Sequence, residues 1–234
     1  VQMLRPARQD GDKSSSKGRG QGHTQRAYCW AYSPPVFEDT KAVVYDFCEG
    51  RAGANARRFL GQWQGTLVTD DFAGYKQLYT QGITEAGCWA HARRKFFDLH
   101  ASSQSPMAAQ ALAYIGQLYE VEREAREQDA TAQQRGLLRQ AKSKPLLDAM
   151  HAWMLLMRQK VMDNSAAAKA LDYSLRRWDA LTRFVDDGQL PVDNNWIENQ
   201  IRPIAIGRNN WLFAGSLRAG QRAAAVMSLI QSAR

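Results

Sequence analysis

The hydrophobic pattern of this chain changes character at Pro106, and this change limits the folds that the chain can adopt. Before Pro106 the apolar residues form short runs. Two of these, residues 27–33 and 42–47, are rich in the aromatic and β-branched side chains that favour strands. From residue 106 to residue 185 apolar residues recur every three or four positions, which is the spacing of helices. The order predicts an α/β protein in which an all-helical block interrupts a core that contains a sheet.

Shorter segments complete the expected core. We expect a helix at residues 55–60, strands at 65–69 and 83–89, a basic helix at 90–100, and two final helices from residue 194 onward. The expected domains are residues 1–105 for the first part of the core, 106–188 for the all-helical block, and 189–234 for the final helices. Residues 10–24 are rich in Gly, Ser, Lys and Arg, cannot bury apolar area, and are expected to form a flexible basic loop.

Charge and cysteine content narrow the class of protein. The chain has 234 residues, a formal net charge of +8 and a pI of about 9.6. A balance this basic indicates a polyanionic partner such as nucleic acid, although a soluble basic protein without one has the same composition. Cys29, Cys48 and Cys88 are odd in number and widely spaced, which speaks against a disulfide framework. With no signal peptide and no apolar run of roughly 18 residues, we expect a cytoplasmic protein without membrane contact.

Two acidic residues stand out by their positions. Asp70 follows a short apolar run at the carboxyl end of an expected strand, which is where open α/β sheets bind ligands. Helix capping is the alternative role for Asp70, unless Asp71 caps and leaves Asp70 facing the site. Glu198 is the one acid in a short helix rich in amides and arginine, with Asp193 as the expected N-cap and a rival for a metal. A plain surface glutamate remains the alternative. Two such carboxylates, if folding brings them together, predict a magnesium site.

Basic, amide and aromatic residues suggest contacts to nucleic acid. Arg93, Arg94 and Lys95 follow the pair Cys88 and His91, which by itself is half a zinc site at best. Further along, residues 206–216 combine glycines, amides, an arginine and two aromatic side chains. They suit either stacking on a strand end or flipped base, or a tight turn with its aromatics in the core.

Several of these stretches together resemble the DDE transposases of the insertion-sequence-66 type. The matching stretches are residues 67–70 with 74–75, 88–96, 143–146, 177–178, 193–195 with Glu198, and 201–216. They cover nearly the whole chain in order. No single stretch would be sufficient, but a chance match of so many is very improbable.

The resemblance implies an RNase H-like mixed sheet with an all-helical insertion before the last catalytic helix. It makes Asp70 the second and Glu198 the third catalytic acid, both ligands of Mg²⁺, for which Mn²⁺ substitutes. The first acid is expected in an Asp-Glu-Thr-Pro stretch ahead of Val1, so we expect this chain alone to be inactive. The expected DNA contacts are Arg93, Arg94, Lys95, Arg202, Arg208, Asn209 and Trp211, and the supporting residues are Cys88, His91, Asn194 and Asn195.

The same resemblance implies partners and a reaction. The partners are the transposon ends and the target DNA, bound by a homo-oligomer near the bacterial nucleoid, and the reaction is metal-dependent strand cleavage and transfer. Two alternatives remain: an inactive DNA-binding or assembly fragment, and an RNase H-like nuclease that cuts without joining.

Overall fold

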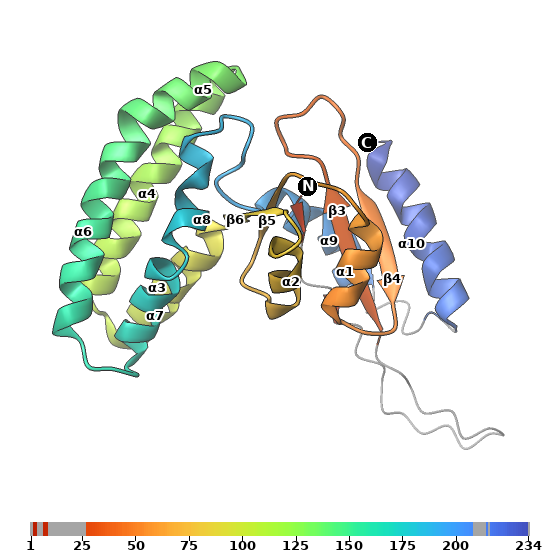
Figure 1. The fold of residues 1–234 in the computed structure, drawn as a ribbon, viewed down its shortest axis with the longest axis horizontal. Coiled ribbons are helices and arrows are strands. Elements are labelled where there is room, and N and C mark those ends of the chain that lie inside the picture. Colours follow the sequence, from red (N-terminus) through yellow and green to blue (C-terminus); the bar gives the residue numbers. More distant parts are fainter. Residues whose placement is uncertain (1, 4–6, 9–26, 208–213, 215, 234) are drawn as a thin grey trace. The chain divides into compact units, whose positions relative to one another are not determined.

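The computed structural model describes residues 2–3, 7–8, 27–207, 214 and 216–233, and it is a mixed α/β structure (Figure 1). The expected basic loop at 10–24 lies outside the described residues. Contacts divide the chain into two compact units, one of residues 1–84 with 194–234 and one of residues 85–193. We call them the sheet unit and the helical unit. Residues 85–105 thus group with the helices, and the domain boundaries at 105 and 188 remain predictions.

One long strand organises the sheet. The strands are β1 (Gln2–Met3), β2 (Ala7–Arg8), β3 (Tyr28–Ser33), β4 (Val44–Cys48), β5 (Thr66–Thr69) and β6 (Thr84–Gly87). Both β1 and β2 pair antiparallel with successive stretches of one edge of β3, and β4 pairs antiparallel with its other edge. On the far side β5 runs parallel to β1, and β6 follows β5 in the strand order. The strands predicted at 27–33, 42–47 and 65–69 are confirmed. The strand predicted at 83–89 is shorter, because Trp89 already begins a helix.

Both faces of the sheet are covered within the sheet unit. Alternate residues of β3 point to opposite faces, as the pleat requires. Trp30 and Tyr32 pack with helix α1 (Gly53–Leu60) and with the turn and helix that follow β5, Ala73–Tyr75 and α2 (Lys76–Tyr79). Cys29 and Ala31 pack on the other face with α9 (Asn195–Gly207) and α10 (Leu217–Ser232). The helix predicted at 55–60 is confirmed as α1.

Helix α10 also covers the backbone of β4. The amide of Val43 donates to Ser232 Oγ at 3.0 Å, and the amide of Tyr45 donates to Ser228 Oγ at 2.9 Å. These groups would otherwise form an exposed strand edge, which is prone to pair with other chains. Close packing of the helix depends on Gly220, since a Cβ there would lie 2.3 Å from the Phe47 ring.

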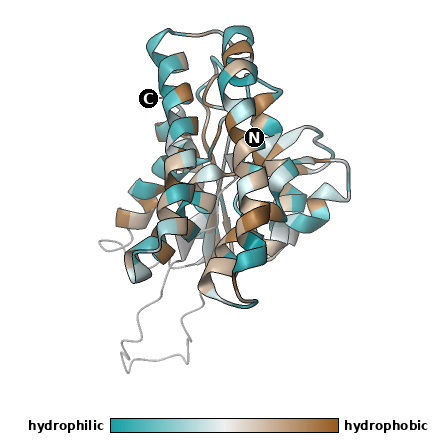
Figure 2. Ribbon diagram, turned by 90° about the vertical axis from the view of Figure 1, so that its left-hand side faces the viewer, coloured by the Kyte–Doolittle hydropathy of each residue, from teal (hydrophilic) through white to brown (hydrophobic). Residues whose placement is uncertain are grey.

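The helical unit contains the helices predicted between residues 106 and 185. Its elements are α3 (Trp89–Ser103), α4 (Pro106–Glu127), α5 (Ala132–Leu138), a π-helical turn (Arg139–Ser143), α6 (Lys144–Lys160), α7 (Ala166–Leu175), α8 (Trp178–Thr182) and a 3₁₀ turn (Arg183–Val185). Side-chain caps begin three of these helices: Ser105, Thr131 and Ser165 each accept a hydrogen bond from a first-turn amide. Figure 2 shows hydrophilic and hydrophobic residues alternating along the helices nearest the viewer, as expected of helices with one buried face.

Candidate functional site

Asp70 directly follows β5 and is 5% exposed. Its Oδ1 accepts a hydrogen bond from the amide of Phe72 at 3.1 Å, which closes the turn after the strand. Asp71 instead forms an exposed ion pair with Lys76 at 3.0 Å. Asp70 therefore accepts the turn bond, and Phe72 stands at the N-cap position of the 3₁₀ turn Ala73–Tyr75 without a side-chain cap. Burial of a carboxylate is costly unless it is hydrogen-bonded or near a cation, and this cost restricts what Asp70 can face.

Glu198 lies in the first turn of α9 and is half-buried. Its amide donates to the carbonyl of Asn194 at 3.2 Å, which makes the buried Asn194 the N-cap position of the helix. The expectation that Asp193 is the N-cap is therefore wrong. Two apolar residues on α9, Ile197 and Ile204, are buried against the sheet, so the helix that carries Glu198 is held firmly within the sheet unit.

The two predicted metal ligands, Asp70 and Glu198, thus belong to the same compact unit. Carboxylate oxygens are the donors that Mg²⁺ prefers, so their chemistry fits this ion. Among the described residues, however, no group of three or more His, Cys, Asp or Glu side chains is close enough to hold a metal. The residues fit magnesium in kind, and the described chain does not complete the ligand set.

Cys88 and His91 lie in the helical unit at the start of α3. The Cys88 Sγ lies 3.2 Å from His91 Nδ1, which is a hydrogen-bonding distance, and Cys88 is buried. A structural zinc ion needs four ligands. Among the described residues, no His, Cys, Asp or Glu side chains join Cys88 and His91 to form a group of three or more, so the zinc site has no complete ligand set. Of the other two supporting candidates, Asn194 is buried at the start of α9 and Asn195 is exposed.

The basic residues predicted to contact DNA are exposed wherever the structure describes them. Arg93, Arg94 and Lys95 are exposed on α3, and Arg202 is exposed on α9. The other three, Arg208, Asn209 and Trp211, lie outside the described residues.

Aromatic rings lie beside two residues of this basic group, which the sequence did not indicate. The Arg93 guanidinium lies 5.7 Å from the centre of the Phe97 ring, which is half exposed. The Lys95 ammonium lies 5.4 Å from the centre of the Tyr173 ring on α7. Phe97 follows Arg93 by four residues and was detectable by helical spacing, whereas Tyr173 is distant in sequence.

Sequence reasoning also missed two exposed arginines on α10, Arg218 and Arg222. The signal was present, because residues 199–234 contain five arginines and no acid. Charge is divided unevenly as well. The sheet unit has 16 basic and 9 acidic residues, and the helical unit has 15 and 14. Nearly all of the positive surplus therefore belongs to the unit that contains Asp70 and Glu198.

Comparisons with known proteins give a consistent result. The family model described as "Transposase IS66 family" matches residues 8–222. Three proteins of Sinorhizobium fredii (strain NBRC 101917 / NGR234), each called "uncharacterized protein", are similar. They are y4qI (36% identical, 92% of this chain, 42% of that protein), y4hP (34%, 82% and 38%) and y4jD (36%, 82% and 39%). The chain thus spans about two fifths of the length of these relatives. No solved structure matches it.

Proposed function

We propose a function that starts from the family: this chain belongs to the IS66 family of transposases. In this proposal the chain forms part of a catalytic region that cuts and joins DNA strands with divalent metal ions. The observation that carries the proposal is the position of Asp70 and Glu198. One acid ends a strand parallel to β1, and the other lies in the first turn of a helix packed on the same sheet.

The sheet topology supports an RNase H-like core. An antiparallel set contains β4, β3 and the β1 and β2 segments, and β5 follows parallel to β1. This strand order and these directions are those expected of that fold. Helices on both faces are consistent with it. In this interpretation the helical unit is an insertion between β5 and α9, which would place the two acids in one core although 128 residues separate them in sequence.

Each acid would have a defined role in this core. Asp70 and Glu198 would bind Mg²⁺, or Mn²⁺ in its place, together with the acid expected ahead of Val1. When bound, such ions activate the attacking hydroxyl and stabilise the leaving oxygen. The turn bond from the Phe72 amide holds Asp70 in one orientation. Packing of Ile197 and Ile204 holds the helix that carries Glu198.

Positive charge would hold the DNA. Exposed Arg202, Arg218 and Arg222 belong to the unit with the acids, and Arg93, Arg94 and Lys95 belong to the helical unit. Contacts of this kind go mainly to phosphates, so binding would depend on salt and little on sequence. The proposed partners are transposon ends and target DNA, bound by more than one copy of the protein.

A change at Glu198 tests the proposal. Glu198→Gln, made in the chain extended upstream by the expected Asp-Glu-Thr-Pro segment, should abolish magnesium-dependent nicking while DNA binding and thermal stability stay unchanged. The matched control is Glu120→Gln, which removes an exposed acid on α4. Full activity in Glu198→Gln would contradict the catalytic assignment.

The same extended protein separates two other functions. If the DNA is only hydrolysed and no 3′ end is joined to target DNA, the result would favour a nuclease over a transposase. DNA binding without any metal-dependent cleavage, even with the upstream acid present, would favour a binding or assembly module.

A further inference from the structure

The segment that returns the chain from the helical unit to α9 is held by hydrogen bonds from several side chains and from one backbone amide of the helical unit. We call residues 184–193 the return segment. It has little regular structure beyond the end of a 3₁₀ turn, so its backbone groups need partners from elsewhere. Three parts of the helical unit supply them, the π-helical turn, α5 and α3. A fourth part, α4, bonds the side chain of Asp193, the residue before Asn194.

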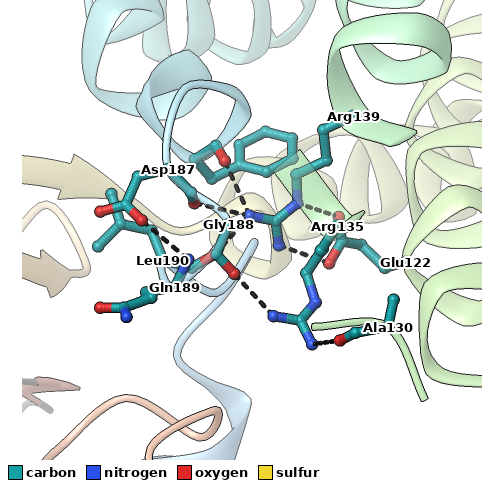
Figure 3. Close-up of polar contacts among 9 residues, drawn as sticks. Glu122, Ala130, Arg135, Arg139, Asp187, Gly188, Gln189 and Leu190 are labelled. Atoms are coloured by element: carbon teal, nitrogen blue, oxygen red, sulfur yellow. Dashed lines mark hydrogen bonds and ion pairs between the residues drawn. The ribbon is translucent and has the colours of Figure 1, made fainter. Parts of the chain in front are cut away.

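The deepest contact is made by Arg139, which lies in the π-helical turn and has no exposed surface. Its Nη1 lies within hydrogen-bonding distance of three carbonyls of the return segment, those of Phe184 (2.8 Å), Asp187 (2.9 Å) and Leu190 (2.9 Å), so one of its two hydrogens is shared between two carbonyls. Its Nε and Nη2 each donate to one carboxylate oxygen of Glu122, at 2.7 Å. Figure 3 shows the guanidinium between Glu122 on one side and the return segment on the other.

A second arginine holds the middle of the same segment. Arg135 Nη1 donates to the Gly188 carbonyl at 2.7 Å, and Nη2 donates to the Ala130 carbonyl at 2.8 Å (Figure 3). Gly188 itself packs against α5 so closely that a Cβ would lie 1.8 Å from the Ala132 carbonyl oxygen. A side chain at residue 188 would therefore displace the segment from the helices.

Two more contacts hold the end of the return segment. The amide of Trp89, the first residue of α3, donates to the Val192 carbonyl at 3.1 Å. Tyr119 on α4 donates its hydroxyl to Asp193 Oδ2 at 2.7 Å. Burial and the nearby Asp193 carboxylate raise the pKa of Tyr119, so the phenol remains a proton donor throughout the working pH range.

The held segment runs directly into the helix with Glu198. Asp193 precedes Asn194, whose carbonyl accepts the hydrogen bond from the Glu198 amide. Helix ends fray most easily at their first-turn bonds. Fixing Asp193 therefore limits fraying of the turn from which the Glu198 side chain projects.

We propose that Tyr119 and Arg139 are positioning residues for Glu198: through the return segment they keep the first turn of α9 formed. This inference rests on the proposed function for the role of Glu198, but not for the mechanical link itself. Neither residue is required to touch metal or DNA.

Hydrogen exchange on the 234-residue chain tests the link directly. In Tyr119→Phe, which removes only the hydroxyl, amide exchange in residues 194–200 should rise about tenfold, while exchange in β4 stays unchanged. The control is Tyr114→Phe on the same helix, where the ring packs on Trp153. Unchanged exchange at residues 194–200 in Tyr119→Phe would overturn the proposal.

A second pair of variants distinguishes positioning from general loosening. Asp193→Asn keeps an acceptor for the phenol and should show less than threefold faster exchange, whereas Asp193→Ala should resemble Tyr119→Phe. The double variant Tyr119→Phe with Asp193→Ala should be no worse than either single one, because all three lose the same bond. Additive effects would contradict the proposed link. In Arg139→Lys, amide exchange should be faster in residues 184–190 as well as in 194–200. If the Arg139→Lys protein fails to fold, the Tyr119→Phe measurement still tests the link.

Activity in the upstream-extended protein separates this inference from the proposed function. There Tyr119→Phe should lower metal-dependent nicking about tenfold with unchanged DNA affinity, and Glu198→Gln should abolish it. If Glu198→Gln stays active, the proposed function fails whatever the exchange data show. If Glu198→Gln is inactive and Tyr119→Phe is fully active, only the positioning inference fails.

Discussion

Arg139 and Glu122 form a two-armed ion pair in the helical unit, with both nitrogen–oxygen distances at 2.7 Å and side-chain exposures of 0% and 6%. Both Nη1 hydrogens of Arg139 are directed to backbone carbonyls, so four of its five N–H groups have protein partners in place of water. A buried pair of this kind contributes modestly to stability as a whole, but loss of either partner leaves a buried charge. The relationship leads to the first prediction.

Glu122→Gln should destabilise the chain by about 3 to 5 kcal/mol, since it leaves the Arg139 charge buried without its carboxylate. Urea unfolding followed by far-UV circular dichroism measures the change. Glu127→Gln on the same helix is the control, because Glu127 and its partner Arg123 are both exposed, and it should change stability by less than about 0.5 kcal/mol. Equal effects of the two variants would contradict the buried network.

Gly220→Ala and Gly116→Ala should have opposite effects, although both add one methyl group inside a helix. At Gly220 the new Cβ would lie 2.3 Å from the Phe47 ring, so we expect a loss of about 1 to 3 kcal/mol. At Gly116 it would meet nothing within 4 Å, so we expect a gain of about 0.5 to 1 kcal/mol from helix propensity. Thermal unfolding of the two variants side by side checks the prediction, and a stabilised Gly220→Ala would show that α10 is not packed tightly on β4.

The Cys48 thiol should react slowly with alkylating reagents at pH 8 in the folded chain. Burial, followed by the hydrogen bond to Asp46, raises its pKa to about 11, and burial raises that of Cys29 to about 12. Only the thiolate reacts, so alkylation by iodoacetamide, read by mass spectrometry, should be at least tenfold slower than in urea.

The same raised values give a pH dependence of stability. The folded state holds the thiol protons more tightly than the unfolded state does. The contribution of these thiols to the free energy of unfolding is therefore complete below about pH 8.5. It should fall as the pH rises from there toward 11, where the unfolded chain has released protons that the folded chain retains. Cys48→Ala should flatten this fall in urea titrations across that range. An unchanged slope would mean that Cys48 does not titrate there.

DNA binding should depend on Arg218 and Arg222, which follow Glu198 in a stretch without acids. Replacing both by Gln should weaken duplex binding and lower the salt dependence of the logarithm of the binding constant by about 2, if each contacts one phosphate. Fluorescence anisotropy between 50 and 200 mM salt measures this slope.

The matched control for DNA binding removes the same charge elsewhere. Arg123 and Arg126 are exposed on α4 among acidic residues, and replacing both by Gln should leave the slope nearly unchanged. Equal losses from the two double variants would indicate an effect of net charge alone and would count against a DNA surface on α10.

The local sequence determined the element types well, because they follow from short-range rules. The strand at β3 and the helices from α4 to α8 appear where side-chain spacing predicted them, and Asp70 does end a strand. Helix caps such as Ser105 and Thr131 also follow local rules. Among the described residues, no helix is long and apolar enough to cross a bilayer.

Only the tertiary structure decided which groups these elements bring together. Nothing near Arg139 in the sequence indicates that it binds carbonyls some 45 to 51 residues away, or that Tyr119 holds Asp193. The sequence also left the roles of Asp70 and Asp71 undecided, since both are suitable turn residues. In the structure Asp70 accepts the bond from the Phe72 amide, and Asp71 pairs with Lys76. The physical reason is the same in each case. Spacing along the chain reports which face of an element is apolar, whereas pairing of buried polar groups depends on partners that only folding brings near.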